Sequence, residues 1–581
     1  MTNKNPWLSE YPKGVSETIN PDEYTSLRDI IDESVSNYAE LPAYTNMGVT
    51  LRFEQIDEYS QQMAIYFQQT LGLKKGDRLA IMMPNLLQYP IVLFGAIRAG
   101  LVIVNVNPLY TARELHHQLN DSGATAIVIL ENFAHVLAEV IEQSPIRHVT
   151  ITRIGDMLGG IKGTLINAVI KYIKKMVPKY QLPGAHSWKQ ALQSGSKGQL
   201  SSVKIEAEDL AFLQYTGGTT GVSKGAMLTH RNMIANLLQA KEWVNFEIGK
   251  EAIITALPLY HIFSLTANCL MFLKIGGCNI LITNPKDIPA FVKTLKTHKF
   301  TFITGVNTLF NALLNHPEID QVDFSHLKIS LGGGMAVQAS VAKRWKQQTG
   351  NVLLEAYGLT ETSPAVCVNP IDLKEYNGAI GLPLPSTEVA ILDENGAALA
   401  PMEEGELCVK GPQVMRGYWQ KDTETKAIFT KDGWLRTGDM AQIDEKGFVR
   451  IVGRQKDMIL VSGFNVYPNE IEDVVMKMPG ILEVAAIGIP DDHSGERIKL
   501  FVVKKEESIT KKAIIDYCKE HLTQYKLPKD VEFCDSLPKT NVGKVLHRAL
   551  REEPPKKGPS FNQAFDSNIK KHQQKKEPQI K

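Results

Sequence analysis

Cysteine is scarce in this sequence and is spread along it. The six residues are Cys269, Cys278, Cys367, Cys408, Cys518 and Cys534, and none belongs to a CxxC pair. This spacing indicates neither a zinc site nor a disulfide framework. It fits a reducing compartment.

A long apolar run and an apolar signal core are also lacking. The first ten residues are polar, and prolines and polar residues interrupt the most apolar region, 79–106. That region falls short of the ~20 apolar residues that a membrane-spanning helix needs. We therefore expect a cytoplasmic chain without a secretion signal.

An excess of one charge is absent as well. The 64 Lys and Arg residues balance 63 Asp and Glu residues, which leaves a formal charge of +1. The whole-chain charge thus gives no argument for nucleic acid as a partner.

The 581 residues exceed what one hydrophobic core organises, so we expect at least two domains. Apolar strands alternate with helical periodicity in the first part of the chain, which predicts α/β architecture with parallel sheets. The predicted strands there are 78–83, 102–106 and 124–130, and the predicted helices are 25–43, 53–71, 88–100 and 111–122. Short strands with turn signals at 388–418 predict a small β subdomain, and 468–531 predicts a separate α+β domain.

One loop, residues 215–226, carries an unusual density of glycine, hydroxyl groups and lysine. Glycines let backbone N–H groups approach an anion, while hydroxyls and a lysine add donors and positive charge. The candidate phosphate ligands are Tyr215, Thr216, Gly217, Gly218, Thr219, Thr220, Gly221, Ser223 and Lys224. The Walker pattern needs Gly-Lys followed by Ser or Thr, and the order here is Ser-Lys-Gly, which argues against an ordinary P-loop NTPase. We expect a helix to follow from Met227 through Leu237.

Other candidate residues follow predicted strands. Gly333 lies in a glycine triplet after the strand 328–331, and the segment 357–361 combines an aromatic ring, a hydroxyl and a carboxylate. Such a carboxylate can hold Mg²⁺ against ATP phosphate. His261 ends the predicted strand that starts at residue 252, and taken alone it is more often a structural histidine.

Residues 161–177 predict a basic amphipathic helix. One face carries the apolar side chains Leu165, Ile166, Val169, Ile170, Ile173, Met176 and Val177, and the opposite face carries Lys171, Lys174, Lys175 and Lys179. Two interpretations stay open: the helix packs on its own domain, or it rests on an anionic membrane surface.

Five motifs in this order resemble the adenylate-forming, or AMP-binding, superfamily. They are residues 215–226, 357–361, 437–439, 453–457 and 538–544. The resemblance covers nearly everything from Leu27 to Arg551. Within the superfamily, the segments 432–457, 461–472, 256–263 and 304–310 are similar to the bacterial long-chain fatty-acid CoA ligases, which belong to the acyl-CoA synthetases.

The resemblance implies a two-step reaction that uses fatty acid, ATP and CoA. A fatty-acid carboxylate attacks the α-phosphate of ATP and releases pyrophosphate, and CoA thiol then displaces AMP from the acyl-adenylate. A medium-chain or aryl acid as substrate, a carrier-protein thiol as acceptor and a non-catalytic lipid-binding scaffold are the alternatives. The sequence leaves chain-length preference and a homodimer open.

The resemblance also implies the roles of particular residues. The catalytic residues would be Lys544, Glu361, Thr216 and His261, with Mg²⁺ on Glu361 and Thr219. Besides the phosphate loop, the nucleotide and CoA would contact Gly333, Tyr357, Gly358, Thr360, Asp439, Arg454, Ser462, Gly463 and Phe464. Lys456 would belong to a hinge. The expected domains are 1–453, a hinge at 454–457 and a smaller mobile domain at 458–553, followed by a basic, disordered tail at 554–581.

Overall fold

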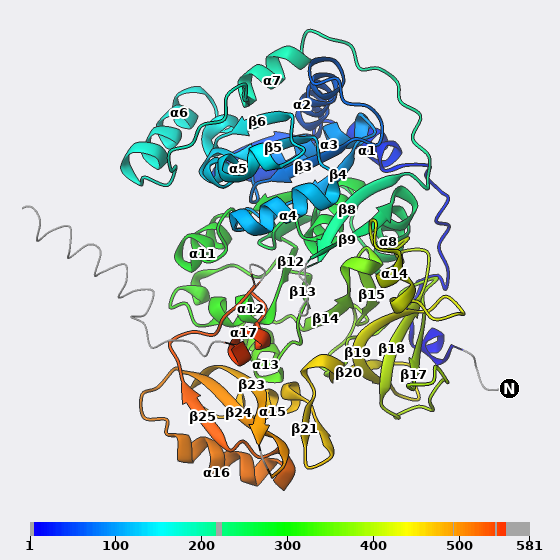
Figure 1. Cartoon of the computed structure of the whole chain (residues 1–581), viewed down its shortest axis with the longest axis vertical. Helices are drawn as coiled ribbons and strands as arrows, with labels where there is room; N and C mark the ends of the chain where they lie inside the picture. The colour runs from blue at the N-terminus through cyan, green and yellow to red at the C-terminus, as the bar shows by residue number, and fades with distance from the viewer. Residues whose placement is uncertain (1–4, 217–222, 492, 541–542, 553–581) are drawn as a thin grey trace, which may run out of the picture. The chain divides into compact units, whose positions relative to one another are not determined.

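The computed structural model describes residues 5–216, 223–491, 493–540 and 543–552 (Figure 1). It contains two compact units. The first holds the residues up to 337 together with 341–437 and 442–450, and the second holds 338–340, 438–441 and the residues from 451 onward. The predicted hinge and domain boundaries stay predictions.

Two large sheets organise the first unit. One runs in the order β7 (His186–Ser187), β6 (His148–Thr152), β5 (Ala126–Leu130), β3 (Arg78–Met82), β4 (Val102–Asn105), β8 (Leu210–Thr216), β9 (Lys224–Thr229). The other runs in the order β16 (Leu382–Pro383), β15 (Ala365–Val368), β14 (Leu353–Gly358), β13 (Ile329–Gly333), β12 (Phe302–Gly305), β10 (Ala252–Thr255), β11 (Cys278–Leu281), β1 (Pro42–Asn46), β2 (Val49–Arg52).

Helices cover both faces of these sheets. They are α1 (Leu27–Asn37), α2 (Phe53–Ile65), α3 (Gln88–Arg98), α4 (Ala112–Ser122), α5 (Ala134–Val140), α6 (Gly160–Ala168), α7 (Trp188–Gly195), α8 (His230–Trp243), α9 (Ile262–Ser264), α10 (Met271–Lys274), α11 (Ile288–Thr297), α12 (Asn307–Leu314), α13 (Ala339–Thr349) and α14 (Asp422–Ile428). In β3, Leu79 and Ile81 join the core under α2 and α3, whereas Ala80 and Met82 join the core under α4 and α5. Burial on both faces explains why the parallel strands are continuously apolar, and it confirms the predicted α/β class.

The structure corrects the prediction of a helix from Met227. Residues 224–229 form strand β9, which pairs antiparallel with β8. Helix α8 starts only at His230, because the Thr229 side chain accepts a hydrogen bond from the backbone N–H of Asn232 and so caps the helix. The phosphate loop therefore joins two strands rather than a strand and a helix.

The remaining sheets are small. The strands β17 (Glu388–Leu392), β18 (Gly405–Lys410), β19 (Leu435–Ile443) and β20 (Val449–Arg454) form the predicted β subdomain. In the second unit a sheet contains β22 (Phe464–Val466), β21 (Ile459–Val461), β24 (Gly495–Lys504), β23 (Ile481–Asp491) and β25 (Asp530–Phe533), with the helices α15 (Pro468–Val475), α16 (Lys511–His521) and α17 (His547–Glu552). This α+β arrangement agrees with the prediction for 468–531.

The helices differ in length and in apolar character. In the part of the chain that the structure describes, no helix combines the length and the apolar character needed to cross a bilayer.

Candidate functional site

The two ends of the predicted phosphate loop face each other in the first unit. Thr216 and Lys224 are paired across β8 and β9. The carbonyl oxygen of Ser223 lies 2.9 Å from Nε2 of His117. The predicted ligands Gly217, Gly218, Thr219, Thr220 and Gly221 lie outside the described residues.

Tyr215 anchors this strand pair. Its hydroxyl donates to Oδ2 of Asp121 at 2.7 Å, and burial followed by this carboxylate raises the pKa of Tyr215. A Cβ at Gly225 would lie only 3.1 Å from the Tyr215 ring, so glycine lets β9 approach the ring closely. A contact of Tyr215 with a ligand stays a prediction.

Tyr418 connects the two charged residues that the sequence singled out in the first unit. The Lys224 ammonium lies 5.1 Å from the centroid of the Tyr418 ring, within the range of a cation–π interaction. The Tyr418 hydroxyl donates to Oε1 of Glu361 at 2.6 Å. The structure thus places Lys224 over the ring of one tyrosine and Glu361 at its hydroxyl.

The segment 415–419 is held against β9 and against Glu361 by backbone hydrogen bonds. The N–H of Trp419 donates to the Gly225 carbonyl at 2.8 Å, and the N–H of Met415 donates to the Glu361 carbonyl at 2.8 Å. The buried Tyr418 side chain is fixed between these two bonds. Sequence reasoning missed Tyr418, and the only signal was the aromatic pair that follows Gly417.

The ends of β13 and β14 bring several predicted nucleotide ligands together. Gly333 lies under the Phe263 ring, where a Cβ would come within 2.8 Å of a ring carbon. A Cβ at Gly358 would lie 2.0 Å from the carbonyl oxygen of Pro364, so only glycine fits there. Tyr357, in β14, is half-buried, and Thr360 begins the short helix η9 (Thr360–Thr362) that carries Glu361.

His261 caps α9 in the same unit. Its Nδ1 accepts a hydrogen bond from the backbone N–H of Phe263 at 3.3 Å. The Phe263 ring covers Gly333, so the segment 261–263 lies beside the end of β13. This placement gives His261 a structural role, and its catalytic role stays a prediction.

A second group of predicted residues gathers within the second unit. Asp439, almost fully buried, forms an ion pair with Nε of Arg454 at 3.0 Å. Burial, followed by the charge of Arg454, lowers the pKa of Lys544 to about 8, while Asp439 and Asp457 oppose this shift. Lys544 therefore carries its positive charge at neutral pH and loses it as the pH rises above about 8.

Backbone bonds fix the loop that carries Lys544. The N–H of Thr540 donates to the Lys544 carbonyl at 2.7 Å, and the N–H of Lys544 donates to Oγ1 of Thr540 at 3.1 Å. These two bonds fix the backbone of Lys544 against Thr540.

The remaining predicted residues lie in a short helix and where β21 meets β22. Lys456 is the middle residue of the short helix η10 (Gln455–Asp457). Ser462 and Gly463 join β21 to β22 with φ values of 51° and 86°. Phe464 is 54% exposed and stacks on Tyr525, with the ring centroids 4.6 Å apart.

Glu361 offers a hard oxygen donor that suits Mg²⁺ together with phosphate oxygens. Among the described residues, no group of three or more His, Cys, Asp and Glu side chains is arranged to hold a metal ion. One carboxylate beside Lys224 and Tyr418 fits an ion that takes most of its ligands from a nucleotide and from water. The partner ligand Thr219 lies outside the described residues.

The sequence matches the AMP-binding enzyme family over residues 31–419, and its C-terminal domain over residues 470–544. The chain belongs to the AMP-binding enzyme family. The first match includes Tyr418, and the second ends at Lys544.

Other members of this family resemble the chain over nearly its whole length. It is 60% identical to the long-chain-fatty-acid–CoA ligase of Salmonella typhimurium, over 95% of this chain and 98% of that protein. ATP-bound MatB from Rhodopseudomonas palustris has a TM-score of 0.75 at 28% identity, over 91% of this chain and 100% of MatB. The anthranilate CoA ligase AuaEII has a TM-score of 0.81 at 21% identity, over 92% and 98% of the two chains, and shares the fold.

Proposed function

We infer that this chain is a long-chain-fatty-acid–CoA ligase that forms AMP. The observation that carries the inference is the 60% identity to such a ligase over 95% of this chain. The described groups around Lys224 and around Lys544 supply the charges that the reaction needs. The carboxylate oxygen of the acid attacks the α-phosphorus of ATP and pyrophosphate leaves, and the CoA thiolate then attacks the acyl carbon and AMP leaves.

In the first unit, Lys224, Thr216 and the other hydroxyls of the loop hold the β- and γ-phosphates. A preorganised cation lowers the barrier by stabilising the charge that develops on the departing pyrophosphate. Glu361, with Thr219, would hold Mg²⁺, which would supply positive charge to neutralise the phosphates. Tyr357 stacks on adenine, and Gly333, Gly358 and Thr360 line the same nucleotide site. His261 borders the acyl pocket.

In the second unit, Asp439 and Arg454 bind the ribose hydroxyls, and Lys544 contacts the α-phosphate and the acid. The buried position of Asp439 beside Arg454 supports this assignment, because the ion pair orients the carboxylate. Ser462, Gly463 and Phe464 contact CoA, and Lys456 belongs to the hinge between the two half-reactions. The protein mainly positions groups and offsets charge.

The proposed function is tested by following AMP formation with ATP, Mg²⁺ and a series of acids from hexanoate to octadecanoate, with and without CoA. We expect CoA-dependent AMP formation that is fastest with long chains. An optimum below decanoate or with an aryl acid would assign a different substrate class. Transfer to a carrier-protein thiol in place of CoA would identify an acyl-AMP ligase.

Tyr418 gives this proposal a test that the sequence motifs do not. Tyr418→Phe keeps the ring over Lys224 and removes the hydroxyl that donates to Glu361. A hydrogen bond to a charged group contributes about 1.5–3 kcal/mol, so we expect pyrophosphate release to slow by about tenfold or more. Tyr260→Phe is a control on a half-buried tyrosine of the same unit and should leave the rate within about twofold. Equal rates for Tyr418→Phe and the unmodified protein would contradict the role of Tyr418.

A further inference from the structure

An apolar strip on α6, on the π-helical turn after it, η6 (Val169–Ile173), and on the residues just beyond points away from the protein. Its side chains are between 37% and 83% exposed. We call it the outer strip, and its members are Ile161, Leu165, Val169, Tyr172, Ile173 and Met176. They make up half of the large apolar side chains that are exposed among the described residues. Figure 1 shows α6 at the margin of the unit, beyond β6 and α5.

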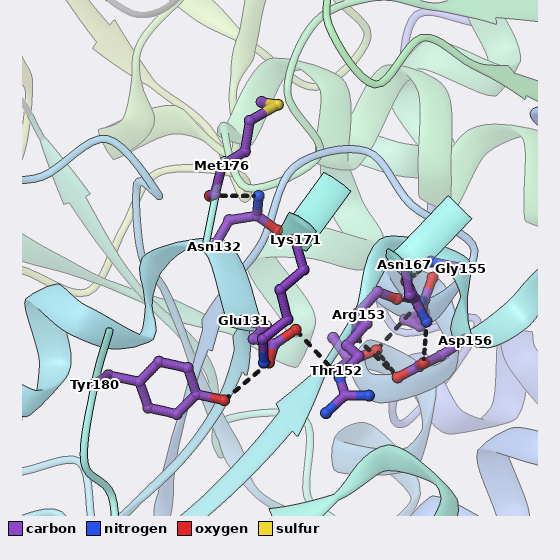
Figure 2. Close-up of polar contacts among 11 residues, drawn as sticks. Glu131, Asn132, Thr152, Arg153, Gly155, Asp156, Asn167, Lys171, Met176 and Tyr180 are labelled. Carbon is purple, nitrogen blue, oxygen red and sulfur yellow. Dashed lines mark hydrogen bonds and ion pairs between the residues drawn. The ribbon is translucent and has the colours of Figure 1, made fainter. Parts of the chain in front are cut away.

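Polar contacts hold the other side of this helix (Figure 2). The Lys171 ammonium donates to Oε1 of Glu131 at 2.9 Å, and the Glu131 side chain is only 4% exposed. Arg153 and Tyr180 bind the same carboxylate, both at 3.1 Å. Because a buried carboxylate without partners is costly, these contacts fix the side of the helix that faces inward.

Two further contacts fix the same orientation. The Asn167 amide accepts from the N–H of Gly155 at 2.8 Å and donates to Asp156 at 3.2 Å. A Cβ at Gly163 would lie 2.1 Å from the Gly155 carbonyl oxygen, so the helix backbone lies directly on that turn. The helix cannot turn its apolar side inward without losing these contacts.

This arrangement differs from an ordinary surface helix, which buries its apolar face. Ile166 packs against the core, but the outer strip is exposed. The structure corrects the predicted helix in two respects. The helix ends at Ile173 rather than at residue 177, because Lys175 takes a left-handed conformation with φ of 51°. Lys171 points inward to Glu131 instead of joining the exposed lysines. The interpretation that the apolar face packs on its own domain does not hold for the outer strip.

The charge around the outer strip indicates what covers it. Residues 157–205 contain eight lysines and no Asp or Glu, in a chain whose formal charge is only +1 overall. Lys174, Lys175 and Lys179 lie around the C-terminal end of the strip and are exposed. Lysines beside an exposed apolar strip with a tyrosine are complementary to an anionic bilayer, where apolar groups enter the acyl boundary and lysines meet phosphate.

We propose that the outer strip docks this protein on a lipid bilayer with anionic headgroups. The helix lies in the plane of the surface, with Leu165 and Ile173 in the acyl boundary and Lys174, Lys175 and Lys179 at the phosphates. Docking of this kind is peripheral and reversible, because it depends on one short helix and a few charges.

The test is co-sedimentation of the full chain with vesicles. We expect binding to an equal mixture of phosphatidylglycerol and phosphatidylcholine, weaker binding to phosphatidylcholine alone and a loss of binding at high salt. Two variants should each lower the vesicle partition coefficient at least tenfold: the pair Leu165→Ser with Ile173→Ser, and the triple Lys174→Gln, Lys175→Gln, Lys179→Gln. All five side chains are exposed, so the thermal unfolding midpoint should stay unchanged.

Matched controls come from the same unit. The exposed residues Ile248 and Met402 serve for the apolar pair, and the exposed lysines Lys286, Lys343 and Lys431 serve for the triple. Their replacement by serine and by glutamine, respectively, should leave vesicle binding intact. In a Tyr172→Trp variant, the fluorescence of the introduced indole should shift to the blue when anionic vesicles are added.

Two outcomes would overturn the proposal. One is vesicle binding that is equal in the unmodified protein, both strip variants and both controls. The other is a concentration-dependent dimer in sedimentation velocity that the Leu165→Ser, Ile173→Ser pair abolishes, together with no vesicle binding by the unmodified protein or by this variant. That result would assign the strip to contact with a second copy of this chain. Neither measurement depends on ligase activity, so failure of the proposed function would be recognised separately.

Discussion

The Lys544→Ala variant is expected to form acyl-adenylate about 10²–10³-fold more slowly than the unmodified protein, which is the usual cost of removing one preorganised group that stabilises transition-state charge. Lys544 is charged at neutral pH, since its pKa is about 8. Its charge would offset the negative charge that builds up on the α-phosphate as the carboxylate attacks. Single-turnover release of pyrophosphate measures this step directly.

The same loop supplies a control for Lys544. Lys539 forms an ion pair with Glu483 on the second unit's own sheet, so Lys539→Ala changes the charge of the loop without removing the proposed catalytic group. The adenylation rate of Lys539→Ala should stay within a few fold of the rate of the unmodified protein. Transfer from preformed acyl-AMP to CoA should be spared in Lys544→Ala. If both half-reactions slowed equally, or if Lys539→Ala were as slow, Lys544 would not have the proposed role.

Local signals in the sequence were enough for most of the α/β layer. Neighbouring positions alone indicate the apolar strands β3 and β5. They also indicate the start of α4, through the capping pair Thr111 and Glu114. The failure at residues 227–229 has a physical reason. Their apolar residues fit both a helix and a strand, and the decision depends on pairing with β8, which a local pattern does not contain.

The site was predictable only where its residues lie in short motifs. Glu361 and Lys224 were found in this way, but Tyr418 lies 57 residues from Glu361 and touches both only in the folded chain. The sequence did not predict the outward orientation of the outer strip, for a similar reason. The helical wheel separated lysines from apolar residues correctly at Leu165 and Ile173, but it could not reveal that Glu131, 40 residues before Lys171, draws that lysine inward.

The Lys456→Pro variant should separate the two half-reactions of the proposed ligase. Proline fixes φ at its own position and restricts the residue before it, so two neighbouring residues of η10 lose the freedom to exchange conformations. We expect adenylation to be kept, because Lys544 lies near Arg454 and Asp439 with the chain at Lys456 as it is in this structure. Thioester formation should fall by about 100-fold, the scale of a small misplacement of reacting groups.

Lys456→Ala distinguishes the backbone from the side chain in this prediction. Alanine removes the same ammonium group but leaves φ free, so both half-reactions should continue near their original rates if only the hinge matters. The two steps are measured separately, as pyrophosphate release without CoA and as acyl-CoA formation from preformed acyl-AMP. If Lys456→Pro left both rates unchanged, the chain would not need to change conformation at this residue. If Lys456→Ala lost thioester formation as well, the side chain of Lys456 would be the group required, and the hinge would have to lie elsewhere in 454–457.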